Sequence, residues 1–455
     1  MNAQIQQMVL SRCFLKKTHP SKDKKMQDRY ASIMKTRRAI TAIAQADQTA
    51  PFAEVIASDL DSFRGLRVAY ATKATRLQIQ EVRLDQIEAA CPMVRSFFDG
   101  SGLLFYTDDI YRKTLAGGAA FHVDFSVSLD KNVAEAFRCF ANGKSYSKPE
   151  EFYRLLLLLR GRGELSFNFD YFSYLIEEME HFDAPNNRRP LETLAALKRF
   201  DHLTPDALRE PPGSPKFLMS QSEGEAAAKT ALDGMMKTLN AQELQVERRG
   251  IHAILLKTMH LRWQKRASPL DSLVEIVQFS LEVLGKLAKL EIYLAWKFLG
   301  CAGTVPKFFA PVLNPGANAL KALKGMSWDV AMFRAAEKFA AMQRHDGHIK
   351  ADFFVPLVAS FDEKFKQLVQ ACPLRAIVMS PATDFVNMIF RDQMPFELAL
   401  RDVLEGPIAA TLNDPRAQSM RQASALSAQR IETAIAKLED AVRDACTQAS
   451  SSIGN

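Results

Sequence analysis

Long uninterrupted hydrophobic runs are missing from this chain of 455 residues. The most apolar long segment extends from Leu273 to Leu299. Six charged residues interrupt it, namely Glu275, Glu282, Lys286, Lys289, Glu291 and Lys297. So many charges in one span argue against a bilayer crossing. The segment is expected to form a buried helix with one polar stripe, and a peripheral membrane helix is the alternative.

A signal peptide is also not expected. The N-terminal stretch MNAQIQQMVLSRCFLKK lacks an apolar core of the length that such a peptide needs. We therefore expect a cytoplasmic protein without a membrane partner.

Paired cysteines are absent as well. The six cysteines are scattered without a CxxC pair, and the eight histidines do not cluster with them. This pattern excludes the usual structural zinc spacings. Scattered cysteines are typical of reduced thiols in the cytosol. No repeat of fixed period is present either.

The composition that is present is that of a globular protein, with 47% hydrophobic and 24% charged residues. The length is sufficient for two or three domains. The formal net charge of +7 permits a nucleic-acid partner without requiring one. Many lysines and arginines lie between Arg12 and Arg38, among them Lys22, Lys24 and Lys25. This segment forms either a solvated basic face or an arm that contacts phosphate.

Changes in composition and in the pattern of apolar residues along the sequence predict five regions. They are a mainly helical N-terminal region (1–100), the first part of an α/β domain (101–183), a helical insertion (184–325), the second part of the α/β domain (326–382) and a C-terminal helical region (383–455). The helical regions are candidates for contacts with a protein partner or a second copy of the chain.

Within the α/β parts, alternating apolar residues in GLLFYTDDIY, AAFHVDFSVSLD and ADFFVPLVASFD predict strands, and LRAIVMSP predicts another. The segments NVAEAFRCFANG and DEKFKQLVQAC predict helices after two of these strands. Beyond Pro381 the chain is expected to be helical. The spacing of Ile431, Ile435, Leu438 and Val442 predicts that the C-terminal helix packs on the body or on a partner.

Acidic residues occur in a notable order beside the apolar segments. Asp130 ends one predicted strand, Glu177 or Glu178 lies on a helix, Asp329 is expected to start a helix, and Asp362 ends another strand. Buried carboxylates are costly unless they are paired or bind a cation. Gathered at one sheet edge, they would suit Mg²⁺ or Mn²⁺. Helix capping is the alternative role for each aspartate, and a solvated helix face is the alternative for the glutamates.

The order of these motifs and the pattern of residues around them resemble those of the PIN-domain nucleases. The resemblance rests on Leu129-Asp130-Lys131-Asn132, on Glu177 or Glu178, on Trp328-Asp329-Val330-Ala331, and on the segment from Ser360 to Phe365. It implies a three-layer α/β/α core with a parallel sheet, extended by large helical segments. Members commonly carry Ser or Thr where this chain has Lys131, and a lysine there could form a salt bridge with a carboxylate.

The resemblance and the charge pattern together predict the site. Asp130, Glu178, Asp329 and Asp362 are the expected metal ligands and catalytic residues, with Glu177 nearly as good a choice as Glu178. Further residues are assigned supporting roles. Asn132 is expected to orient the first ligand through a hydrogen bond, Asp384 is an alternate acid, and Arg334 and Lys364 are expected to contact the substrate.

The predicted function is a metal-dependent nuclease that uses Mg²⁺ or Mn²⁺ and acts on RNA or another single-stranded nucleic acid. Within the family such RNases serve as toxins, in RNA maturation or decay, and in defence against phage. The alternative is a non-catalytic PIN-like or helical protein that acts as a scaffold or binds nucleic acid.

Overall fold

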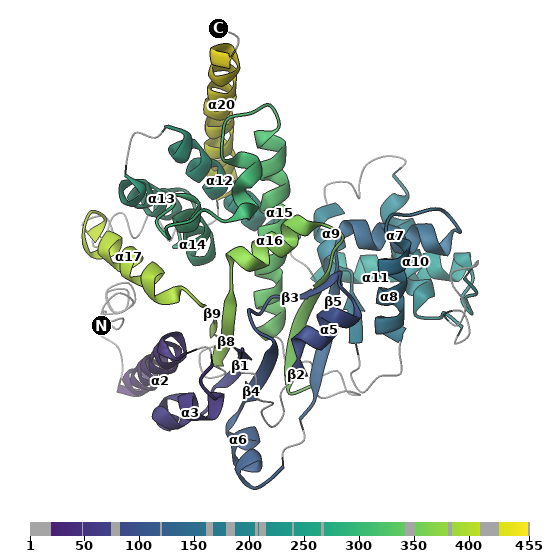
Figure 1. The fold of residues 1–455 in the computed structure, drawn as a ribbon, viewed down its shortest axis with the longest axis horizontal. Helices are drawn as coiled ribbons and strands as arrows, with labels where there is room; N and C mark the ends of the chain where they lie inside the picture. Colours follow the sequence, from purple (N-terminus) through teal and green to yellow (C-terminus); the bar gives the residue numbers. More distant parts are fainter. Residues whose placement is uncertain are drawn as a thin grey trace.

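Two β-sheets lie at the centre of a mostly helical α/β chain in the computed structural model (Figure 1). The structure describes residues 20–47, 49–73, 82–118, 121–160, 167–178, 187–204, 208, 215–238, 241–264, 268–341, 351–380, 385–409 and 427–453. No helix in these ranges is both long enough and apolar enough to cross a bilayer. The five described cysteines are free thiols.

The first sheet is antiparallel and combines strands from both ends of the chain. Its order is β2-β4-β1-β8-β9, with the bounds Val82–Arg83, Gly102–Tyr106, Arg67–Thr72, Leu374–Ser380 and Phe385–Phe390. One face is covered by α2 (Pro20–Gln45), α3 (Phe52–Ser58) and α4 (Leu60–Phe63). The ring of Phe52 stacks on Tyr70 of β1, with 4.5 Å between centroids. Because such rings bury large apolar areas, this cluster holds the N-terminal helices on the sheet.

The second sheet is mixed and has the order β3-β7-β5-β6. The bounds of these strands are Val94–Ser96, Phe353–Ala359, Val123–Leu129 and Phe167–Asp170. Strand β5 runs parallel to both β7 and β6, whereas β3 is antiparallel to β7. Consequently β5, β6 and β7 end at the same edge of the sheet.

The other described helices pack on the two sheets or on one another. They are α5 (Leu84–Ala90), α6 (Asp108–Leu115), α7 (Lys131–Ala141), α8 (Pro149–Arg160), α9 (Phe172–Glu178), α10 (Arg189–Phe200), α11 (Gln221–Thr238), α12 (Ala241–Gln264), α13 (Pro269–Val283), α14 (Lys289–Phe298), the 3₁₀ helix η3 (Lys307–Val312), α15 (Ala319–Ala341), α16 (Glu363–Ala371), α17 (Gln393–Glu405) and α20 (Ala428–Ile453). Helices α7, α8, α10 and α11 group on one side of the mixed sheet (Figure 1).

Aromatic side chains join that helical group to the mixed sheet. Phe137 of α7 meets Phe152 of α8 and Phe200 of α10, each at 4.9 Å between ring centroids. Phe169 of β6 packs on Phe200 as well. Burying each ring stabilises the fold by roughly 2–3 kcal/mol. This cluster therefore holds in place α7, the helix that directly follows Asp130 in the chain.

Several expected elements are confirmed. Strands β4, β5, β7 and β8 and helices α7 and α16 form where the apolar periodicity predicts them. Between residues 184 and 325 the described residues form no named strand, as expected for a helical insertion. The C-terminal helix α20 packs on α12 and buries Ile431 and Val442 completely.

Other expectations about the fold are wrong. The core is divided into two sheets of different type, whereas one parallel sheet was expected. Strand β9 follows Pro381, where a helix was expected. The described part of the region 1–100 is mainly helical, but it also contains β1, β2 and β3, which were not predicted. Local periodicity failed here because short strands buried on both faces lack the alternation that identifies a strand.

Two helix boundaries also differ from expectation. The apolar segment from Leu273 to Leu299 is broken into α13 and α14, and Gly285 adopts φ +67° between them. Helix α15 starts at Ala319, so Asp329 lies in its interior and does not start it. No proline separates Ala319 from Asp329, and the single glycine of this stretch, Gly325, lies within the helix, which therefore continues through Asp329.

Candidate functional site

Strand β5 carries a buried polar face that leads to Asp130. Its apolar side chains are Phe125, Val127 and Leu129, and the residues that alternate with them are Asp124, Ser126, Ser128 and Asp130. All four polar residues are at most 7% exposed. A strand places alternate side chains on opposite faces, so these four share one face.

The neighbouring strand β6 satisfies most of this polar face. Ser126 and Ser128 donate from Oγ to Oδ2 of Asp170 at 2.9 and 2.7 Å. Asn168 donates from Nδ2 to Oδ1 of Asp124 at 2.8 Å. These hydrogen bonds offset the cost of burying the polar groups and fix the register of β6 beside β5.

Asp130 is joined to the end of β7 through Ser360. The Asp130 backbone N–H donates to the carbonyl of Ala359 at 3.0 Å. The Ser360 hydroxyl donates to Oδ2 of Asp130 at 2.7 Å, and the same hydroxyl accepts from the backbone N–H of Asp362 at 3.0 Å. Asp130 and Asp362 therefore lie at adjacent parallel strand ends, linked by one serine.

Asp362 also caps a helix. Its Oδ1 accepts from the backbone N–H of Lys364 at 2.8 Å, in the first turn of α16. Asp130 occupies the corresponding position before α7, but its side chain does not cap that helix. The capping role weighed for both aspartates is thus seen for Asp362 alone.

Asp329 joins the two strand-end aspartates from helix α15, which packs against β7. Burial raises the pKa of Asp329 well above its ordinary value, and repulsion from Asp130, Asp362 and Glu177 raises it further, with Lys364 opposing. Burial likewise raises the pKa of Asp130, and repulsion by Asp362 adds to this, against the hydrogen bond from Ser360. Repulsion of this kind requires the carboxylates to be near neighbours.

Helix α9 contributes both glutamates, which have different partners. Burial raises the pKa of Glu177 to about 7, and repulsion from Asp130 raises it as well. Glu178 is only 3% exposed and forms an ion pair with Lys131. The salt bridge that the sequence suggested for Lys131 is therefore present.

We name Asp130, Glu177, Asp329 and Asp362 the acidic cluster.

The remaining predicted residues lie around this cluster or apart from it. Lys364 is exposed and close enough to Asp329 to lower its pKa. Asn132 is exposed on the first turn of α7. Arg334 forms an ion pair with the buried Glu291, at 2.6 Å from Nη2 to Oε2. Asp384 lies outside the described residues.

The donor chemistry of the cluster suits a divalent cation, since carboxylate oxygens are the ligands of Mg²⁺ and Mn²⁺, and a cation would relieve their repulsion. The observed side-chain positions fit less well. Among the described residues, no group of three or more His, Cys, Asp or Glu side chains is arranged so that it could hold a metal ion. The cluster is therefore an assembled acidic patch whose side chains, in the positions observed, do not form a metal-binding group.

Residues that the sequence analysis did not single out complete the site. Ser360, Asp170, Ser126 and Ser128 form the hydrogen bonds that orient it. The alternation in DFSVSLD indicates the polar face of β5, and this signal could have been used. The partner of each serine depends on strand pairing, which no local pattern gives.

Comparison of the chain with protein-family models, with curated proteins and with solved structures found no match.

Proposed function

We propose that the acidic cluster is the hydrolytic site of a divalent-metal-dependent nuclease that cleaves RNA. One observation carries the proposal: Asp130 and Asp362 follow adjacent parallel strands and are linked by Ser360, with Asp329 and Glu177 close enough to repel them. Ligand sites of open α/β sheets commonly lie at such carboxyl ends. The PIN-like order of the motifs supports the same assignment.

The chemistry of phosphodiester hydrolysis agrees with such a cluster. Bound Mg²⁺ or Mn²⁺ would lower the pKa of a coordinated water and stabilise charge on the phosphate oxygens. In this proposal Asp130, Asp329 and Asp362 provide the anionic ligands. Ser360 holds the Asp130 carboxylate in one orientation through its hydrogen bond.

Glu177 is the best candidate for proton transfer. Its raised pKa of about 7 means that its carboxylate can accept a proton from water near neutral pH. Glu178, the first choice from sequence, is engaged by Lys131 instead. We therefore assign Glu177 the role of general base or ligand, and Lys364 the neutralisation of substrate phosphate near Asp329.

A second candidate function is a non-catalytic nucleic-acid-binding or scaffold protein with the same fold. The observation that favours it is the Lys131–Glu178 ion pair, which places a permanent cation among the acids. A lysine in this position reduces the net negative charge that would attract a metal ion.

The deciding experiment incubates the full chain with labelled single-stranded RNA and DNA in Mn²⁺ and in EDTA. We expect the Asp130→Asn, Asp329→Asn double variant to lower Mn²⁺-dependent RNA cleavage at least about 100-fold, because both positions would be metal ligands. The matched control is Asp109→Asn, an exposed acid of α6 that pairs with Lys113.

Retained activity in the control together with loss in the double variant would support the proposal. Equal cleavage by the wild type and the double variant would overturn it, since the activity would then arise elsewhere. A wild type that binds RNA but cleaves nothing in any divalent metal would favour the second candidate.

A further inference from the structure

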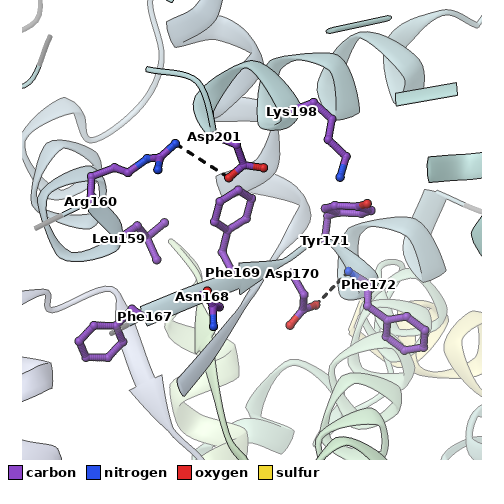
Figure 2. A pocket seen from close by; sticks show the side chains of 10 residues that line it. All are labelled: Leu159, Arg160, Phe167, Asn168, Phe169, Asp170, Tyr171, Phe172, Lys198 and Asp201. Atoms are coloured by element: carbon purple, nitrogen blue, oxygen red, sulfur yellow. Dashed lines mark hydrogen bonds and ion pairs between the residues drawn. The ribbon is translucent and has the colours of Figure 1, made fainter. Parts of the chain in front are cut away.

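A pocket of about 490 Å³ lies beside strand β6, outside the acidic cluster (Figure 2). Its volume falls within the range of roughly 300–1,000 Å³ that is usual for small-molecule sites. Strand β6 is the last strand of the mixed sheet, so within the described chain one of its edges has no neighbouring strand. The pocket occupies the space between this edge and the helices α8 and α10.

The lining of the pocket combines cations with aromatic rings. Nζ of Lys198 on α10 lies 5.1 Å from the ring centre of the lining residue Tyr171. Cζ of Arg160 on α8 lies 5.0 Å from the ring centre of Phe200, a buried residue that packs on the lining residue Phe169. Figure 2 shows Arg160 beside Asp201 on one side and Lys198 next to Tyr171 on the other. Such an arrangement offers both a planar stacking surface and positive charge.

The charges of the pocket leave one cation available. Arg160 is 4.0 Å from Oδ1 of Asp201 and donates to the carbonyl of Phe200. Oδ1 of Asp170 accepts from the backbone N–H of Phe172, and its other oxygen accepts from the serines of β5. Lys198 forms no ion pair within 4 Å in the described ranges. It acts on Asp201 only at longer range, where its charge opposes the rise that burial causes in the pKa of that carboxyl, and its ammonium is therefore in a position to meet an anionic group.

The pocket is connected to the acidic cluster along two elements. Asp170 pairs in register with Ser128, two residues before Asp130, which places the two aspartates roughly 8 Å apart at the Cα atoms. Helix α9 starts at the pocket residue Phe172 and ends at Glu178, a length of about 9 Å. A nucleic-acid strand could span this distance within a few nucleotides.

We propose that this pocket seats a nucleotide of a single-stranded nucleic-acid substrate, with the base against Tyr171 and a backbone phosphate at Lys198. The inference rests on the proposed function and deepens it, because it assigns a nucleotide-binding pocket that would direct a strand toward the acidic cluster. An open pocket of this kind selects single strands, since a base within a duplex is stacked and paired and cannot enter the pocket.

The test measures binding in EDTA, where cleavage is stopped, by fluorescence anisotropy with labelled oligouridylate and oligothymidylate of about 12 nucleotides. We expect Tyr171→Leu to weaken binding about 10-fold with an unchanged salt dependence, since stacking is lost. Lys198→Ala should weaken binding several-fold and lower the salt slope by about 1, and Lys198→Arg should restore both.

Lys113→Ala provides the control, because this lysine belongs to α6, a helix that lies apart from α8 and α10 (Figure 1). Thermal melts of each variant verify folding. Unchanged affinity in both folded pocket variants would overturn the pocket assignment even if the acidic-cluster variants lose cleavage. Normal wild-type binding that depends on Lys198 and Tyr171, without any cleavage, would retain the pocket and reject the nuclease.

Discussion

Lys131 is a cation that lies beside the buried acids of the site. It follows Asp130 directly and forms an ion pair with Glu178, which is 3% exposed. Removing one member of such a pair leaves the other charge buried without a partner. The lysine therefore stabilises the fold locally while it lowers the negative charge available to a metal ion.

A double-mutant cycle on this pair tests the local effect. We expect Lys131→Met to destabilise the protein by about 1–3 kcal/mol, because Glu178 loses its cation, and we expect less additional loss when Glu178→Gln is combined with it. Thermal and urea unfolding of the four proteins give the coupling energy.

The exposed pair Lys366–Glu363 on α16 is the matched control, with 3.5 Å between Nζ and Oε2. Its removal should change stability by no more than about 0.5 kcal/mol. Additive effects at Lys131 and Glu178 would contradict the idea that the ion pair stabilises this site.

Among the elements, helix α20 is attached to the body through α12. Buried Ile431 and Val442 provide the apolar contact. At the same interface His252 of α12 faces Glu439 of α20 at 3.7 Å. Burial lowers the pKa of His252 to about 4, and the nearby cations Arg248 and Lys324 lower it too, against the opposing effect of Glu439. The folded interface thus prefers the neutral imidazole.

This preference predicts an acid-sensitive interface. The folded pKa lies below the unfolded value of 6.5, so the unfolded state binds more protons between about pH 6.5 and 4. The contribution of the buried neutral His252 to the free energy of unfolding is complete above pH 6.5. It is lost as the pH falls from 6.5 to 4, and the loss reaches up to about 3 kcal/mol.

When the pH falls from about 7 to about 5, we expect the melting temperature of His252→Gln to fall by less than that of the wild type, because glutamine takes up no proton. Differential scanning calorimetry at both pH values measures this. The control is His202→Gln, which removes an exposed histidine. Parallel losses in the wild type and His252→Gln would refute the assignment.

The whole molecule brings together residues that are distant in the sequence. Strand β1 pairs with β8, and β5 pairs with β7, across the long helical segment between them. Asp130 and Ser360 are 230 positions apart and share a hydrogen bond. The acidic cluster therefore exists only when the entire chain has folded, and its charges oppose folding in the absence of a cation.

A divalent cation should accordingly stabilise the whole protein. Because a ligand that binds only the folded state adds free energy by mass action, saturating Mn²⁺ should raise the melting temperature by roughly 2–5 °C relative to EDTA. The shift should disappear in Asp130→Asn, Asp329→Asn and persist in Asp109→Asn. Equal shifts in all three proteins would place the bound metal elsewhere.

The alternation of apolar and polar residues around the site can be read directly from the amino-acid sequence. It predicted strands that end at Asp130 and Asp362, the helices α7 and α16 that follow them, and the apolar contact of α20. These features were accessible because each depends on the periodicity of a few neighbouring residues, which local burial dictates.

Three features became known from the folded chain alone: the division of the strands into two sheets, the position of Asp329 inside α15, and the ion pair between Lys131 and Glu178. Folding also placed Ser360 on Asp130 and opened the pocket beside β6. These outcomes depend on pairings between segments far apart in the chain, whose free energies come from register and packing that no single stretch of residues encodes.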